Sequence, residues 1–271
     1  MKLRFCHILL GFVLLRASVL QAQIRWFEIE DVDSTQWGWN LTRHIENAFC
    51  LSNETGENGP SFEFIFVATD TLSVDSLGRD ITFKGFFMTT TEITQRQWIL
   101  VMGAPNPQWR WRDDNLPATH VTPSMALEFC RRIDSIQGTQ WYRLPTDKEW
   151  FFAAQGGHYS DQYRYFGSNN PHHIGWYQSN SNRQPHPVAQ KVANELDLYD
   201  MGGNVSEIVL NSATPKRSYL ALGGNYSQSE EWMQLRPSDA PVMSAYSSPM
   251  VGFRIVFDWT YHIFDYGLMS N

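Results

Sequence analysis

The chain has 271 residues, with 21 Lys or Arg against 28 Asp or Glu, and its formal net charge is −7. This acidic balance argues against nucleic acid as a partner, because proteins that bind phosphate backbones present basic surfaces. The length suits one large or two small domains, and the 11 tryptophans favour a compact fold rich in irregular structure over a disordered chain.

Residues 1–22 have the layout of a secretory signal peptide. Lys2 and Arg4 precede an apolar run from His7 to Leu15, and the small residue Ala22 offers a cleavage site. The run is too short to span a bilayer. We therefore expect a secreted protein of the bacterial periplasm or cell surface, not an integral membrane protein. Its mature form keeps 18 basic and 28 acidic residues, a net charge of about −10.

The remaining chain is expected to form one domain. Residues 23–79 are polar and irregular around a strand candidate, "FEFIFVAT", and form its N-terminal segment. Residues 80–260 form the rest, which opens with a second strand candidate, "ITFKGFFMT". The alternating segment "VGFRIVFDW" predicts a strand near its end. Residues 261–271 are expected to be a C-terminal tail.

Three helices are predicted in the first half of residues 80–260. A capping-box pattern at Thr94 predicts a helix that ends at Gly103. Thr122, which is followed by proline, predicts a second helix that ends at Gly138. A further capping box at Thr146, in "YRLPTDKEWFFAAQGG", opens the third helix, which two glycines stop. After it the helical signals end, and about a hundred residues of loops and short strands follow.

The second helix is predicted to have one buried face. Four apolar side chains recur on roughly one side of it: Met125, Phe129, Ile133 and Ile136. Cys130 is expected on the buried face, where a free cysteine serves as a small apolar residue. Cys50 is the other cysteine that remains after signal removal, so a disulfide between the two stays an open alternative in an oxidising compartment.

Six segments in order resemble the formylglycine-generating enzyme family, also called sulfatase-modifying factor domains. They are "FFMTTTEITQRQW", "HVTPSMALEFCRRI", "YRLPTDKEWFFAAQGG", "HPVAQKVANELDLYDMGGNVSE", "LALGGNYS" and "GFRIVF". The resemblance covers residues 80–257. It implies an α+β fold, a variant of the C-type lectin fold that is rich in loops, with few helices and short antiparallel strands.

The resemblance also implies that the family's copper chemistry is absent. In the catalytic branch, two cysteines after the Gly-Gly motif hold a copper ion that activates oxygen. An ungapped alignment of "LGGNYSQSEEWMQLR" places Gln228 and Met233 at those positions, and residues 131–271 contain no cysteine. Copper(I) requires soft thiolate ligands. We therefore expect no copper and no catalytic residues of this kind.

The stretch "YDMGGNVSEIV" is a candidate calcium loop. Asp200 and Glu207 are hard oxygen ligands, and the glycines between them allow the chain to turn its carbonyls inward. The resemblance implies a structural calcium held by these two side chains and by the carbonyls of Gly203 and Val205. The alternative is that Asp200 caps a turn, Asn204 takes a left-handed conformation, and no ion binds.

Two residues depart from the family pattern. Ala189 stands where the family has an acidic ligand of a second calcium site, so that site is expected to be lost. Ser206 stands where the family has a tryptophan that helps to build the substrate-facing floor. Its presence implies a changed pocket.

Two arginines and two histidines are predicted to serve the scaffold or the surface. Arg143 is expected to pair locally, and Arg254 of "GFR" is expected to form a buried ion pair with several hydrogen bonds. His172 and His173 lack helical metal-ligand spacing and are expected at the surface.

The segment between the Gly-Gly and "GFR" motifs is predicted to frame a ligand-binding cleft. We expect a non-catalytic protein that binds a ligand or acts as a scaffold in the cell envelope or a secretion machinery, with a protein, peptide or glycan as partner. Aromatic and Arg residues dominate binding hot spots. The candidate cleft residues are Ser206, Tyr226, Gln228, Trp232, Met233, Arg236 and Tyr246. The alternative is a diverged enzyme of the family with chemistry that does not use copper.

Overall fold

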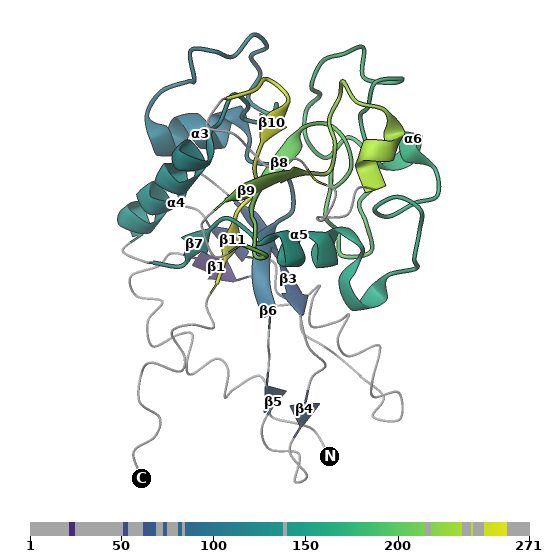
Figure 1. The fold of residues 1–271 in the computed structure, drawn as a ribbon. Coiled ribbons are helices and arrows are strands. Elements are labelled where there is room, and N and C mark those ends of the chain that lie inside the picture. Colours follow the sequence, from purple (N-terminus) through teal and green to yellow (C-terminus); the bar gives the residue numbers. More distant parts are fainter. Residues whose placement is uncertain are drawn as a thin grey trace.

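The computed structural model describes residues 62–68, 85–137, 140–214, 218–234, 240 and 247–258, together with the backbone of a few short strands outside them (Figure 1). Cys50, the predicted C-terminal tail and the predicted signal peptide apart from Ala22 lie outside the described residues.

In chain order, six short strands precede the first described helix, and helices and short strands are interspersed after it. The described elements are β1 (Ala22–Ile24), β2 (Leu51–Asn53), β3 (Glu63–Ala68), β4 (Ser73–Val74), β5 (Ile81–Thr82), β6 (Gly85–Thr89), α3 (Gln95–Met102), α4 (Pro123–Gln137), β7 (Tyr142–Arg143), α5 (Asp147–Ala154), η1 (Gly157–Tyr159), α6 (Pro171–Ile174), β8 (Ser206–Leu210), β9 (Tyr219–Leu222), η2 (Glu230–Gln234), β10 (Val251–Gly252) and β11 (Val256–Phe257). No described helix has the length and apolar character needed to cross a membrane.

The strands form a six-stranded sheet, a three-stranded sheet and the pair β4–β5. The large sheet has the order β1-β2-β3-β6-β11-β7, and each of its pairs is antiparallel. The small sheet has the order β10-β8-β9, in which β8 and β10 are parallel. Most of the described pairing is therefore antiparallel, as predicted, and the parallel pair was not expected from the sequence.

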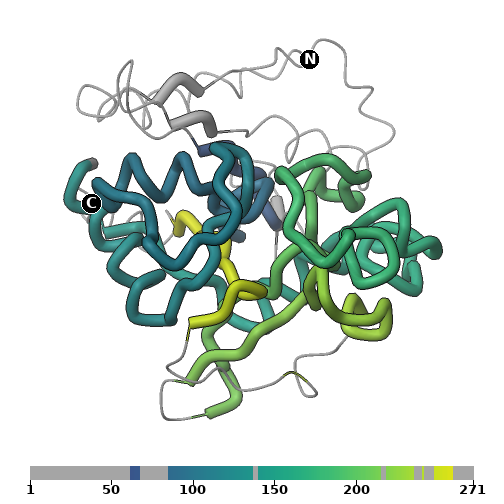
Figure 2. The backbone as a smooth tube through the Cα atoms, turned by 90° about the horizontal axis from the view of Figure 1, so that it is seen from above, coloured from purple at the N-terminus to yellow at the C-terminus, as the bar shows by residue number. Residues whose placement is uncertain are grey.

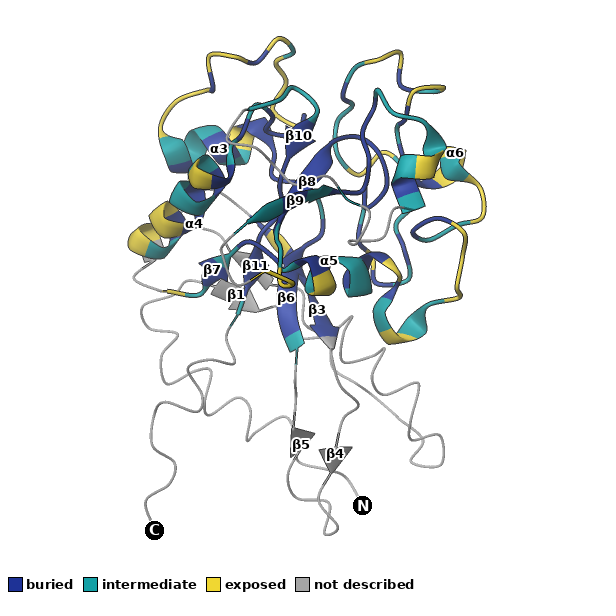
Figure 3. Cartoon of the chain, in the orientation of Figure 1, coloured by how far each residue is buried: buried dark blue, intermediate teal, exposed yellow. Residues whose placement is uncertain are grey.

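Alternate residues of β3 belong to two hydrophobic clusters. Phe62, Phe64 and Phe66 pack in a cluster with residues of α3 and α4, whereas Ile65 and Val67 pack in another with residues of α5, β8 and β9. Successive side chains of a strand point to opposite faces of its sheet. The core therefore lies on both faces of the large sheet, and most described residues of β3, β6, β8, β10 and β11 are buried (Figure 3).

The three predicted helices are confirmed, with their caps. Thr94 and Thr146 each accept a hydrogen bond from the third residue of the helix that follows, and the side chain of that residue bonds back. Gly103 closes α3 in the left-handed conformation at a φ of 82°. The prediction of no helix beyond the third was wrong, because Asn170 caps the short helix α6.

One face of α4 is buried, as predicted, but not along its whole length. Phe129, Ile133 and Cys130 are buried, whereas Ile136 near the end of the helix is 53% exposed. The predicted face was wrong at Ile136, because the helix extends beyond the cluster that it covers. Cys130 is free, and burial raises the pKa of its thiol, so it acts as a small apolar residue.

The C-terminal strands lie between two halves of the domain. Seen from above, residues 85–137 occupy one side and the loop-rich residues from about 150 to 205 occupy the other, with the segment 247–258 between them (Figure 2). This segment supplies β10 to the small sheet and β11 to the large one. The motif "GFR" therefore lies where the two sheets meet.

Candidate functional site

A fully buried ion pair connects the two sheets. Arg254 donates to Glu207 from Nε at 2.6 Å and from Nη2 at 2.8 Å, and the indole Nε1 of Trp150 donates to the same carboxylate at 2.6 Å. Both charged side chains are 0% exposed. Burial alone lowers the pKa of Arg254, but the carboxylate of Glu207 outweighs it and raises that pKa. The prediction of a buried, multiply bonded pair is confirmed.

A second buried carboxylate, that of Glu92, holds the glycine loop. Its two oxygens accept hydrogen bonds from Asn204 Nδ2 at 2.8 Å and from the Val205 amide at 3.1 Å. Asn204 has a φ of 51°, in the left-handed region, as the alternative without an ion had expected. Burial, followed by the charges of Asp200 and Glu207, raises the pKa of Glu92 well above its usual value.

Asp200 is also buried and is only half satisfied. Its Oδ2 accepts a hydrogen bond from the Ala189 amide at 2.8 Å, while its Oδ1 is buried with no hydrogen-bond partner among the described residues. Burial raises the pKa of Asp200 to about 6. Both residues have positive φ, 56° for Asp200 and 58° for Ala189, so this carboxylate holds a strained turn in place.

The predicted calcium ligands lie close in sequence but are not equally available. Both oxygens of Glu207 accept hydrogen bonds from Arg254, and one of them also accepts one from Trp150. Asp200 has one free oxygen. Within the described residues, no group of three or more His, Cys, Asp or Glu side chains is arranged to hold a metal ion. Calcium therefore stays a prediction, in which Glu207 is the weakest member of the ligand set.

The predicted cleft residues lie mostly inside the protein. Tyr226 is 2% exposed, Ser206 is 5% exposed and Met233 is fully buried, so none of these three presents its side chain at the surface. Gln228 and Trp232 are half-buried. Arg236 and Tyr246 lie outside the described residues. The expectation that Tyr226 is a surface anchor is corrected, because large aromatic residues serve cores as readily as interfaces.

A hydrogen-bonded polar cluster surrounds Ser206. The Asn225 side-chain amide donates to Ser206 Oγ at 3.0 Å and to Gln228 Oε1 at 2.7 Å. Ser181 Oγ donates to the Tyr226 carbonyl at 2.6 Å. The Ser206 hydroxyl, at the position of the family's tryptophan, therefore accepts a hydrogen bond from a side chain of the same protein.

A stacked ring pair lies beside the glycine loop. The rings of Trp176 and His186 stack with centroids 3.8 Å apart, and Lys191 Nζ lies 3.9 Å from the Trp176 centroid. Lys191 also donates to the His172 carbonyl at 2.9 Å. His172 and His173 are exposed, as predicted. These contacts tie the loop-rich half together without a regular sheet.

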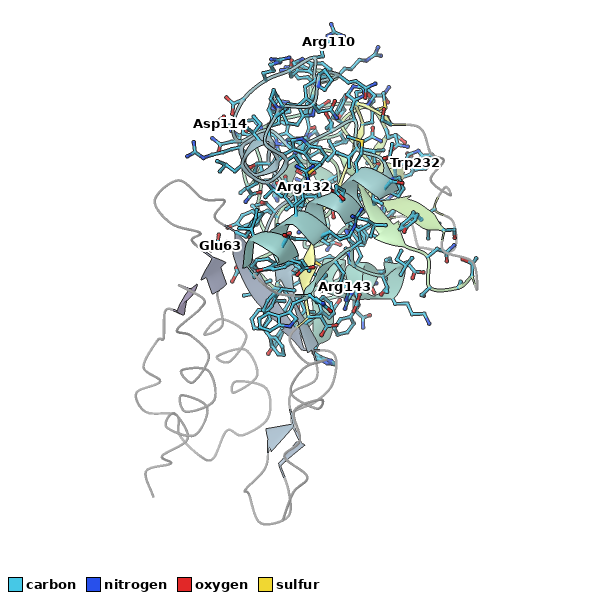
Figure 4. All side chains as sticks on the ribbon, turned by 90° about the vertical axis from the view of Figure 1, so that its left-hand side faces the viewer. Glu63, Arg110, Asp114, Arg132, Arg143 and Trp232 are labelled. Atoms are coloured by element: carbon cyan, nitrogen blue, oxygen red, sulfur yellow. The ribbon has the colours of Figure 1, made fainter. Side chains whose placement is uncertain are left out.

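The sequence interpretation did not single out the loop between α3 and α4. Trp111 of this loop packs edge-to-face with Tyr226 at a centroid distance of 6.0 Å, and the guanidinium of Arg110 lies 5.1 Å from the Trp111 centroid. Figure 4 shows Arg110 at one end of the molecule, far from Arg143. The run "QWRWR", which interleaves aromatic and basic residues, is the sequence signal that could have pointed to this surface.

The chain matches the family described as "Sulfatase-modifying factor enzyme 1-like domain" over residues 62–259. It is 33% identical to "Chaperone protein LppX" of Paenibacillus barcinonensis, in an alignment that covers 48% of this chain and 63% of that protein. The chain thus spans less than two thirds of that relative's length.

Solved structures share the fold at low sequence identity. The Treponema denticola variable protein 1 has a TM-score of 0.59 at 20% identity, and covers 76% of this chain and 98% of its own. PvdO from Pseudomonas aeruginosa has a TM-score of 0.57 at 14% identity, and the match covers 74% of this chain and 95% of PvdO. CarF has a TM-score of 0.56 at 21% identity, and the match covers 73% of this chain and 98% of CarF. The predicted fold class is confirmed, and the chain belongs to the family of sulfatase-modifying factor enzyme 1-like domains.

Proposed function

We propose that this protein is an exported, non-catalytic member of its family that binds a partner in the bacterial cell envelope, as a ligand-binding or scaffold protein of the periplasm or cell surface. The observation that carries the proposal is the environment of Gln228 and Met233, which align with the copper cysteines of the catalytic branch. Both side chains have internal structural contacts. Neither is a thiolate, the ligand that copper(I) requires.

Gln228 is held by the chain on two sides. Its Oε1 accepts from the Asn225 side chain at 2.7 Å, and its carbonyl accepts from the Gln178 amide at 2.9 Å. Met233 is fully buried in a small cluster with three other residues, Tyr165, Ile174 and Tyr177. A thioether in an apolar cluster contributes packing. These contacts support a scaffold role for the positions where the catalytic branch binds metal.

Export and envelope partners rest on the N-terminal pattern of residues 1–22. The name "Chaperone protein" of the Paenibacillus barcinonensis relative is in keeping with a function in binding other proteins. The competing proposal is a diverged enzyme of the family that uses other chemistry.

A copper and substrate assay separates the two proposals. We expect the purified protein to bind no stoichiometric copper and to leave the cysteine of a Cys-x-Pro-x-Arg peptide unchanged after incubation with copper, oxygen and a thiol reductant. Metal analysis and peptide mass spectrometry are the measurements. A family member that has both cysteines, treated in parallel, shows that the assay works. Formylglycine in the peptide, or copper bound at one equivalent, would overturn the non-catalytic proposal.

Calcium binding at the glycine loop is a separate proposal. The carboxylates of Glu92, Asp200 and Glu207 all act electrostatically on the buried guanidinium of Arg254, and Asp200 Oδ1 has no partner among the described residues. Buried charges are costly unless they are paired or coordinate a metal. This surplus of carboxylates supports a bound cation, with Asp200 as its side-chain ligand.

Removal of calcium should lower the melting temperature by about 5–10 °C, if calcium is present at about 100 times its dissociation constant. The ion stabilises because it binds the folded state alone. Differential scanning calorimetry with and without EGTA measures the shift, and Asp200→Asn should abolish it. Asp197→Asn is the matched control, since Asp197 is exposed and three residues away. An unchanged melting temperature of the wild-type protein in EGTA would show that no stabilising calcium binds.

A further inference from the structure

We propose that Arg110, Trp111 and Arg112, in the loop between α3 and α4, form a docking site for an acidic peptide segment of a partner protein. The site deepens the proposed binding function and rests on it. Its core is an exposed guanidinium that lies over a half-buried indole ring, at 5.1 Å from the ring centroid.

The loop holds Arg110 between two anchored tryptophans. Trp109 is buried, and its indole Nε1 donates to the Thr119 carbonyl at 2.9 Å. The Trp111 carbonyl accepts from the Gln95 side-chain amide at 3.0 Å. A binding residue on a fixed backbone loses less conformational freedom when its partner arrives. Arg110 is therefore placed in advance for a contact.

The ring of Trp111 is fixed as well. It packs edge-to-face with Tyr226, whose hydroxyl donates to the Pro249 carbonyl at 3.4 Å. The Trp111 ring thus rests on Tyr226, which is itself buried. Trp and Arg are the residues most enriched at binding hot spots.

The two arginines carry the positive charge of this loop, whose acidic residues are Asp113 and Asp114. Arg110 and Arg112 are exposed, and no described carboxylate pairs with either of them. The neighbouring acids have other partners, since Asp114 pairs with Arg96 at 3.3 Å and Asp113 accepts from the Asn115 amide at 2.9 Å. The loop therefore presents positive charge on a protein whose net charge is −7.

This geometry favours a carboxylate as the group that is recognised. A guanidinium that lies over a ring can still present N–H groups that match the two oxygens of a carboxylate. Stacking of a sugar requires an open indole face, but Arg110 covers one face of Trp111 and Tyr226 contacts the ring too. Long polyanions such as nucleic acids are repelled by the acidic protein as a whole. A short acidic segment of a protein supplies carboxylates without the extended negative charge of a long polyanion.

Fluorescence anisotropy with a labelled hexaglutamate peptide tests the site on the full chain, with hexaglutamine as the neutral probe. We expect hexaglutamate to bind about tenfold more tightly than hexaglutamine, and less tightly as salt rises. Arg110→Gln should weaken hexaglutamate binding about tenfold, as for the loss of a charge-assisted bidentate contact. Arg110→Lys should recover only part of that loss, because lysine keeps the charge but not the fork.

Arg131→Gln is the matched control, because Arg131 is 72% exposed on α4 and its guanidinium pairs with Glu128 of the same helix. Equal affinity for the two probes, or an equal loss in Arg131→Gln, would overturn the proposal. Stronger binding of a sulfated oligosaccharide than of hexaglutamate would assign the loop to a glycan and would also overturn it. The copper and peptide-oxidation assay is independent of these outcomes, so failure of this site and failure of the non-catalytic function are distinguishable.

Discussion

Replacement of Arg254 with methionine should lower the free energy of unfolding by about 3–5 kcal/mol. The substitution keeps a long side chain but leaves the fully buried Glu207 without its counter-ion. It also removes donors from the Thr89 and Tyr199 carbonyls, which Arg254 bonds at 2.9 and 2.8 Å. An uncompensated buried charge costs more than the pair itself contributes. Urea denaturation followed by fluorescence measures the loss.

Arg143→Met is the control for a partly exposed pair. Arg143 is 34% exposed and pairs with Glu149 at 2.7 Å and Asp258 at 2.9 Å, so the predicted local pairing is confirmed and a second partner is added. We expect its replacement to cost about 1 kcal/mol. The double variant Arg254→Met with Glu207→Leu should recover part of the loss, since the carboxylate that Arg254 pairs with is removed as well. If Arg254→Met and Arg143→Met lowered the free energy of unfolding equally, the claim that breaking the buried pair costs more than breaking the partly exposed one would be wrong.

Trp150→Ala should lower the free energy of unfolding by about 3–5 kcal/mol. Trp150 is completely buried on α5, and its ring packs edge-to-face with Phe166 at a centroid distance of 5.5 Å. The substitution leaves a cavity and also removes a donor from Glu207. Thermal and urea denaturation, monitored by circular dichroism, report the loss.

Two neighbouring substitutions separate the cavity from the hydrogen bond. Trp150→Phe keeps most of the ring and removes the indole donor, so its cost should fall to about 1–3 kcal/mol. Phe151→Ala changes a half-buried residue of the same helix, which also packs against Phe166, and it should cost less than Trp150→Ala. If Trp150→Ala were as stable as Phe151→Ala, the claim that the buried Trp150 ring contributes more to stability than its half-buried neighbour would be wrong.

The helices could be predicted from the sequence because their signals are local. Thr94 and Thr146 act within three residues of their own positions, and both capping boxes are present. The burial of Ile136 near the end of α4 was predicted wrongly, because its exposure depends on where the neighbouring cluster stops, which no local pattern encodes.

The site could be predicted only in part because its contacts are distant in sequence. Arg254 was expected to be in a buried pair, but its partner Glu207 is 47 residues away and had been assigned to calcium. Tyr226 and Met233 were assigned to a cleft, although aromatic and thioether side chains suit a core equally well. Trp111 was missed, because its contact with Tyr226 follows from the path of a loop that has no periodic pattern.

Strand β11 has a consequence for the order in which the molecule forms. It lies between β6 and β7, so an inner strand of the large sheet is supplied by Val256 and Phe257, which follow every other described strand in the chain. Until these residues have been synthesised, the sheet is incomplete and Glu207 lacks its arginine. Domains generally fold as units. The large sheet and the buried ion pair can therefore reach their native form only after residues 254–257 have left the ribosome, so fragments that stop before residue 250 should lack both.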